Sequence, residues 1–147
     1  MSDLPIPALL MSAKQAAVAE LHERLTAEGH ETIREGHGCV FGFIQTEGSR
    51  LTYLAEQSGL TKQAVGEVVD DLQRLGYLER VPDPSDGRAK LVRLTDQGAG
   101  ARAIGRSILD EIEERWAEQI GEERVATMRE ALEELHALAT GHAPTPA

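Results

Sequence analysis

Two short helical segments joined by a tight turn constrain the fold of this chain more than any other feature. Thr52 is placed to cap a helix that runs through Ser58, where Gly59 can adopt the positive φ that ends it. Thr61 is placed to cap a second helix, which Gly76 closes. The apolar residues of this second helix recur at helical spacing and form one stripe: Val65, Val68, Val69, Leu72 and Leu75. Two capped helices joined by so short a turn predict a helix-turn-helix.

A strand-like hairpin follows the second helix. Residues 77–81 predict one strand, and Leu91, Val92 and Leu94 predict its partner. Between them the sequence PDPSDGR places Pro, Asp and Gly where a hairpin turn needs them. A hairpin directly after a helix-turn-helix forms a wing, and Thr95 is placed to cap the helix that comes next.

Longer amphipathic helices flank this unit. One is expected over residues 8–28 and a shorter one over residues 40–46, ended by Gly48. A long helix over residues 96–119 is interrupted at Gly121 and followed by a last helix over residues 122–139. The first and last helices carry apolar stripes, from Leu9 to Leu25 and from Val125 to Leu138, that one winged unit could not cover. We therefore expect a homodimer held by both ends of the chain.

These elements predict a mostly α fold, a winged helix-turn-helix with a small β-hairpin wing and N- and C-terminal dimerisation helices. Residues 1–147 form one domain, in which 48–98 are the winged part, 8–30 and 99–140 the dimerisation helices, and 141–147 a disordered tail. No apolar run approaches the roughly 18 residues of a membrane span, no signal-peptide pattern opens the chain, and the single cysteine excludes an intrachain disulfide. We expect a cytoplasmic protein without a membrane partner.

The distribution of charge leaves room for a nucleic-acid surface. The formal net charge of −10 argues against nucleic acid when the chain is taken as a whole. Residues 50–95, however, hold seven of the fifteen Lys and Arg residues and seven Asp and Glu residues, a net charge of zero, while both flanking segments are acidic. A binding face needs only a local basic patch, so the predicted winged part is where such a face would lie.

The second helix of the predicted pair carries candidate base and phosphate contacts. Opposite its apolar stripe lie Lys62, Gln63, Gly66 and Glu67. Lys62 suits a phosphate or a guanine, Gln63 can pair with adenine, and Gly66 allows close approach of the backbone. The alternative is a solvated helix face without a partner. Asp70 and Asp71 would repel phosphate, so we expect them further along the helix, on a solvated face.

The predicted wing carries cations at alternating positions. Arg88 follows Asp86 at the expected hairpin tip, and Lys90 and Arg93 lie on the return strand. A guanidinium at the tip of a thin wing can enter a minor groove, and Asp86 could hold Arg88 in place by a charge-assisted hydrogen bond. The alternative is an exposed ion pair worth roughly 0–1 kcal/mol. The candidate DNA-contact residues are Thr52, Thr61, Lys62, Gln63, Gly66, Glu67, Asp86, Arg88, Lys90 and Arg93.

Residues 51–98, with their "D-x-R" wing and "LT-x-x-G" exit, resemble the winged helix-turn-helix of the MarR-type transcriptional regulators. The resemblance implies a triangular dimer that binds a pseudo-palindromic double-stranded DNA operator. It also implies repression relieved by a phenolic or other small aromatic effector, bound where the dimerisation and DNA-binding parts meet. Gly87 stands inside the wing motif where family members often have a second arginine, so we expect weaker binding by the wing.

Several alternatives remain open at this stage. A redox-sensing regulator would use Cys39, activated by His37, whereas the apolar residues after Cys39 favour a small buried side chain. An interaction module that has lost DNA binding would fit the acidic balance. The five histidines show no metal-ligand spacing, and no nucleophile–base set or phosphate-binding loop is present, so we expect no metal, no cofactor and no enzymatic activity.

Overall fold

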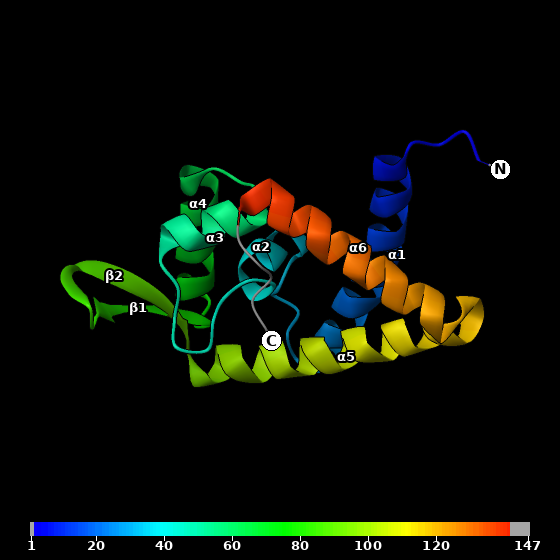
Figure 1. The fold of residues 1–147 in the computed structure, drawn as a ribbon. Helices are drawn as coiled ribbons and strands as arrows, with labels where there is room; N and C mark the ends of the chain where they lie inside the picture. The colour runs from blue at the N-terminus through cyan, green and yellow to red at the C-terminus, as the bar shows by residue number, and fades with distance from the viewer. Residues whose placement is uncertain (1, 142–147) are drawn as a thin grey trace.

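Helices dominate the computed structural model of the chain, which describes residues 2–141. A long helix spans the molecule, and the helix-turn-helix and the wing lie at one end of it. Of the two further helices, one crosses the long helix, and the other turns back from its far end toward the helix-turn-helix (Figure 1). The elements, in chain order, are α1 (Ile6–Ala27), η1 (Glu35–His37), α2 (Gly38–Phe41), α3 (Leu51–Ser58), α4 (Lys62–Arg74), β1 (Leu78–Asp83), β2 (Asp86–Leu94), α5 (Asp96–Ile120) and α6 (Glu122–Thr140). The mostly α fold with a hairpin wing is thus confirmed.

The hydrophobic core lies where the helix-turn-helix meets the base of the wing. Val40 of α2, Leu54 of α3 and Val65, Val69 and Leu72 of α4 have no exposed surface. The predicted stripe of the second helix is therefore the buried face of α4. A second part of the core lies where α1 crosses α5 and is formed by Ala17, Leu25, Ala101, Ile108 and Ile112.

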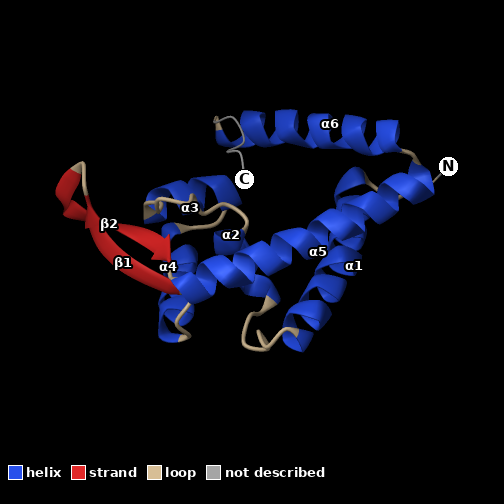
Figure 2. Ribbon diagram, turned by 90° about the horizontal axis from the view of Figure 1, so that it is seen from below, coloured by secondary structure: helices blue, strands red, loops and turns tan. Residues whose placement is uncertain are grey.

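The wing is a two-stranded antiparallel hairpin that projects from the helical body (Figure 2). Leu78 pairs with Leu94, and the register holds until an irregularity between Pro82 and Asp83. The turn is shorter and earlier than expected, because β2 already begins at Asp86. Asp86, Gly87 and Arg88 therefore lie on the strand beside the turn and not at its tip.

The helix caps agree in part with the sequence predictions. Thr61 accepts a hydrogen bond from the backbone N–H of Ala64, and Gly59 ends α3 with a φ of 74°. Thr52 does not cap α3: the N-cap position lies two residues earlier, at Arg50, which has no side-chain cap. The chain therefore enters α3 from an extended Arg50, and Thr52 lies within the first turn.

Other helix boundaries also differ from the expectations. Helix α1 begins at Ile6, because Pro7 lies in its first turn, where the missing N–H has no intrahelical partner to lose. The short helix expected over 40–46 is replaced by the turn η1 and the four-residue α2, so it begins and ends earlier. Helix α6 ends one residue later than expected, at Thr140, where Gly141 has a φ of 71°. The predicted tail lies outside the described residues except for Gly141.

Tyr77 joins the parts of the fold. Its side chain is 1% exposed, its hydroxyl lies 2.9 Å from Nδ1 of His30 in the loop after α1, and its ring meets Phe41 edge to face. Its backbone carbonyl accepts a hydrogen bond from the N–H of Thr95, the residue that caps α5. One residue thus connects the α1 loop, α2, the wing and α5.

We expect Gly98→Ala to destabilise the fold where α5 begins. A Cβ at position 98 would lie 2.0 Å from the backbone oxygen of Tyr77, so the first turn of α5 would have to move. The expected loss is about 1–3 kcal/mol of the free energy of unfolding. Gly100→Ala is the matched control, because nothing lies within 4 Å of that Cβ position; in a helix it should stabilise by up to about 1 kcal/mol. Urea unfolding measures both, and equal effects of the two substitutions would contradict the packing argument.

Candidate nucleic-acid interface

The N-terminal turn of α4 presents the sequence-predicted contact residues to solvent. Thr61, Lys62, Gln63 and Glu67 are exposed, and none of residues 2–141 forms an ion pair with Lys62. The backbone N–H groups that begin a helix carry a partial positive charge, which Lys62 reinforces. This end of α4 can therefore bind an anion. The exposed side chains of Lys62 and Gln63 can contact groups that lie beyond the anion.

Gly66 and Thr52 lie differently from the other candidates. Gly66 is half-buried, and a Cβ there would meet Cδ2 of Leu51 at 3.7 Å, so its free side faces α3. A Cβ would make an ordinary contact there, so the packing of the two helices does not require a glycine at this position. Thr52 is exposed in the first turn of α3.

On the wing, Arg88 and Lys90 are exposed and form no ion pair within the described chain. Oδ1 of Asp86 accepts a hydrogen bond from the backbone N–H of Arg88 at 3.1 Å. The expected ion pair between Asp86 and the guanidinium of Arg88 is not formed, because the short side chain of Asp86 is turned to the backbone. The guanidinium of Arg88 is consequently free for another partner.

Arg93 stands apart from these two cations. Its Nε and Nη2 donate to Oε1 of Glu79, directly across the hairpin, at 2.9 and 2.6 Å. Side chains alternate between the two faces of a regularly paired strand, so Arg93 lies on the opposite face from Lys90, whereas Arg88 lies within the irregular part of β2. The ion pair with Glu79 thus sets Arg93 apart from Arg88 and Lys90, which form no ion pair among the described residues.

Asp83 fixes the orientation of the wing, and the sequence analysis did not single it out. Its carboxylate is buried and accepts hydrogen bonds from the N–H and the hydroxyl of Ser85 at 2.9 and 2.7 Å. It also accepts from Nε and Nη2 of Arg50, at 2.8 and 2.7 Å, at the start of α3. The hydrogen bonds from Ser85, followed by that from Arg50, lower the pKa of Asp83 to about 2. The D-P-S sequence is a signal for the local turn, but no signal marks Arg50 as the distant partner.

Asp70 and Asp71 of α4 are both paired. Oδ1 of Asp70, which is exposed, lies 2.8 Å from Nη2 of Arg80 on β1. The expectation of a solvated face is wrong for Asp71, which is half-buried and bonded to His37 and Arg74. The reason is that η1 packs beside this face of α4 and places an imidazole against it. These contacts, the one from His37 first, lower the pKa of Asp71.

An apolar cavity of about 540 Å³ lies where α1, the η1–α2 segment and α5 meet. Its lining includes Leu21, Ile33 and Phe41, with Arg34 and Arg106 among the polar residues. Nδ1 of His22, another lining residue, is buried without a hydrogen-bond partner in the described structure. The cavity can therefore take a mostly apolar molecule.

Cys39 lines the same cavity, and its surroundings do not suit a redox-active thiol. Burial raises the pKa of Cys39, the direction opposite to the one that a reactive thiolate needs, and its Sγ lies 3.4 Å from the carbonyl of Gly36. The imidazole of His37 bonds to the N–H of Arg34 and to Asp71. Both of its nitrogens are therefore engaged, and the ring does not activate the thiol of Cys39.

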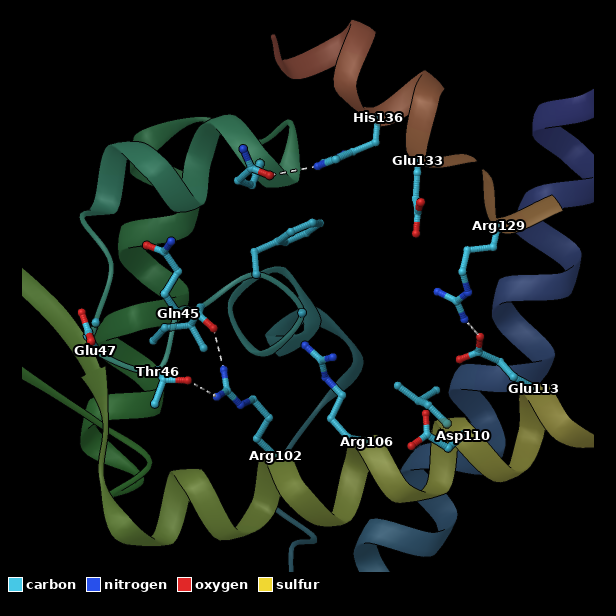
Figure 3. Close-up of a pocket in the computed structure, with 16 residues that line it drawn as sticks. Gln45, Thr46, Glu47, Arg102, Arg106, Asp110, Glu113, Arg129, Glu133 and His136 are labelled. Carbon is cyan, nitrogen blue, oxygen red and sulfur yellow. Dashed lines mark hydrogen bonds and ion pairs between the residues drawn. The ribbon is translucent and has the colours of Figure 1, made fainter. Parts of the chain in front are cut away.

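A second, polar cavity of about 1040 Å³ lies between the α2–α3 segment, α5 and α6 (Figure 3). Nη1 of Arg102 donates to the carbonyl of Ile44 at 2.5 Å, and burial, followed by the nearby Arg106, lowers the pKa of Arg102. On the far side, Nε2 of His136 lies 2.9 Å from Oε1 of Gln57, which connects α6 to α3.

Within residues 2–141, no group of three or more His, Cys, Asp and Glu side chains could hold a metal ion. In the same range no helix is long and apolar enough to cross a membrane.

We expect Asp83→Asn to loosen the wing in a pH-dependent way. Because folding lowers the pKa of Asp83 to about 2, its stabilising effect is complete above the ordinary aspartate pKa of about 3.9 and is lost as the pH falls toward 2. The difference in free energy of unfolding between wild type and Asp83→Asn should thus be largest near neutral pH and shrink below about pH 4. Asp86→Asn is the control, because its carboxylate accepts a single backbone N–H. A difference that does not change with pH would contradict this role of the carboxylate.

Comparisons with known proteins agree with this geometry. The family model described as MarR family matches residues 35–89. A MarR-family transcriptional regulator from Rhodococcus sp. RHA1 is 26% identical, with a TM-score of 0.73 over 92% of this chain and 98% of that chain. CouR from Rhodococcus jostii RHA1, solved bound to p-coumaroyl-CoA, is 26% identical, with a TM-score of 0.74 over 99% of both chains.

A more distant structure shares the fold alone. A mutant of MepR from S. aureus, solved bound to an oligodeoxyribonucleotide, is 22% identical, with a TM-score of 0.57 over 90% of this chain and 96% of that chain. A search of curated proteins finds no match. The winged part of this chain thus matches the MarR family model, and the whole chain is similar in sequence and fold to MarR-family transcriptional regulators.

Proposed function

We propose that this protein is a homodimeric repressor that binds a pseudo-palindromic operator in the cytoplasm and is released from it by a small aromatic effector. The observation that carries the proposal is the set of unpaired, exposed side chains at one end of the molecule. Lys62 and Gln63 begin α4, and Arg88 and Lys90 extend along the wing. Both elements lie at the same end of the fold (Figure 1).

The two elements suit different grooves. An α-helix fits the major groove, where Gln63 can pair with N6 and N7 of adenine and Lys62 can reach a phosphate or a guanine. A thin hairpin fits the minor groove, whose negative potential attracts a guanidinium such as that of Arg88. The Asp83–Arg50 contact supports this division, because it holds the wing at a fixed angle to α3.

Exposed apolar side chains on the terminal helices support a dimer. Leu9 and Met11 of α1 are 45% and 57% exposed, and Leu135 and Leu138 of α6 are 57% and 82% exposed. No residue of α6 is buried. A second copy would cover these faces, and a twofold axis would pair two α4 helices with two half-sites.

The apolar cavity supports an aromatic effector. Its volume falls within the usual range of small-molecule sites, and it adjoins both the terminal helix α1 and the segment that packs on α4. The aromatic acyl-CoA in the CouR structure makes p-coumarate and p-coumaroyl-CoA the first effectors to test.

The experiment that tests DNA binding is selection of bound fragments from a random duplex pool. A repressor of this kind should enrich a pseudo-palindrome with half-sites about one helical turn apart. Binding should weaken as salt rises. Failure to enrich any sequence, together with no salt-sensitive binding to duplex DNA, would favour an interaction module that has lost DNA binding.

On the selected operator, substitutions in the wing and in α4 should have different effects. Arg88→Ala removes a cation whose contacts are independent of sequence, so affinity should fall for operator and scrambled DNA alike. The salt slope should become shallower by about one phosphate per half-site. Gln63→Ala should cost roughly 1–3 kcal/mol on the operator and leave scrambled DNA nearly unaffected.

Titrations of both duplexes at several salt concentrations separate the two effects. Arg124→Ala, which removes an exposed arginine near the start of α6, is the control for loss of a cation. If Arg88→Ala binds both duplexes with the wild-type salt slope, the wing does not contact DNA.

Leu135→Glu should weaken the dimer. The substitution places a charge on the exposed apolar face of α6, where a partner helix would have to bury it. We expect a dimer dissociation constant at least about tenfold higher, measured by analytical ultracentrifugation, since roughly 1.4 kcal/mol corresponds to a factor of ten. Leu60→Glu, at an exposed leucine between α3 and α4, should leave the dimer intact. A Leu135→Glu protein that dimerises like the wild type would show that α6 is not in the interface.

A further inference from the structure

A buried histidine connects the wall of the apolar cavity to α4. His37 is 4% exposed and lies at the end of η1. The residues on either side of it in sequence, Arg34, Glu35, Gly38 and Cys39, line the cavity. The imidazole itself points the other way, and its Nε2 lies 2.7 Å from Oδ2 of Asp71 on α4.

The hydrogen bonds of His37 define its tautomer. The backbone N–H of Arg34 donates to Nδ1 at 2.9 Å, so Nδ1 carries no proton. The proton is therefore on Nε2, which donates to the carboxylate of Asp71. One edge of the ring is thus bonded to the backbone of the cavity wall and the other edge to α4. Because the ring is buried, the two bonds lie in a medium of low dielectric constant, where each is strengthened.

Asp71 belongs to the helix that presents Lys62 and Gln63 at its other end. An α-helix of this length moves as a rigid body, so a shift at Asp71 changes the position of its first turn as well. Within α4, the carboxylate of Asp71 is bonded to Arg74. Among the described residues outside α4, His37 is the one whose side chain bonds to it. The hydrogen bond between His37 and Asp71 therefore connects the cavity wall to α4.

We propose that His37 is a positioning residue that couples occupation of the apolar cavity to the position of α4 on DNA. The inference rests on the proposed function, since it needs both an operator and a cavity whose occupation weakens binding to it. A ligand that displaces the segment from Arg34 to Cys39 would pull or release Asp71 through the imidazole. Removing the imidazole should leave each site working and break the coupling between them.

The single cysteine allows the test to proceed without the natural effector. Cys39 lines the cavity, and benzyl methanethiosulfonate converts it to a benzyl mixed disulfide with loss of methanesulfinate. Because burial raises the pKa of Cys39, labelling is carried out at mildly alkaline pH and checked by mass spectrometry. The label places one aromatic group in the cavity, and operator affinity is then measured at neutral pH with and without it.

We expect the label to lower the operator affinity of the wild type about tenfold, within the usual range of allosteric coupling. In His37→Asn, which keeps an acceptor for the N–H of Arg34 but cannot reach Asp71, the unlabelled affinity should stay within about threefold of wild type. The label should then lower the operator affinity of His37→Asn by less than about threefold. Asp71→Asn serves as the second variant, should His37→Asn not fold, and is expected to lose part of the coupling.

Asp70→Asn is the matched control, because it removes a neighbouring carboxylate that bonds to Arg80 and not to His37. It should respond to the label as the wild type does. A full response to the label in His37→Asn, or no response in the wild type, would overturn the inference and leave DNA binding in place. Absence of DNA binding by the unlabelled wild type would instead overturn the proposed function.

Discussion

The packing of Tyr77 is the constraint on which the rest of the structure depends. Its buried ring and hydroxyl bind the loop after α1 and the segment α2, and its carbonyl receives the N–H of Thr95 at the start of α5. Because this carbonyl lies so close to Gly98, the long helix can leave the wing in one direction only. The terminal helices, the cavity beside them and the helix-turn-helix are therefore held in a fixed relation, which coupling between distant sites requires.

Ion pairs explain how an acidic chain can present a basic surface. Four of the carboxylates between residues 50 and 95 are bonded to arginines or a histidine, and these contacts hold the wing and α4 to their neighbours. Arg50, Arg80 and Arg93 thus have structural partners. Lys62, Arg88 and Lys90 have no ion-pair partner among the described residues, and they lie on the exposed surfaces of α4 and the wing. The position of these three cations, more than the net charge, favours DNA as a partner.

Local sequence signals predicted the fold well and the long-range contacts poorly. Thr61, Thr95 and Gly59 were correctly assigned, because caps and left-handed glycines depend on a few adjacent residues. The pairs Asp83–Arg50 and His37–Asp71 join residues more than thirty positions apart, and no periodicity links them. Thr52 and Asp71 were misjudged for the same reason: the extended Arg50 and the packed η1 decide what surrounds them. The candidate residues could therefore be named from the sequence, but the pairing of Arg93 with Glu79 across the hairpin required the strand register.

The central claim is that two copies of the helix-turn-helix and wing bind one operator together. Hydroxyl-radical footprinting of the selected duplex tests it most directly. We expect protection of two backbone segments about one helical turn apart, where the α4 helices enter the major groove, flanked symmetrically by protection of the minor groove from the wings. Protection of a single half-site, or of two half-sites without the flanking minor-groove protection, would contradict it.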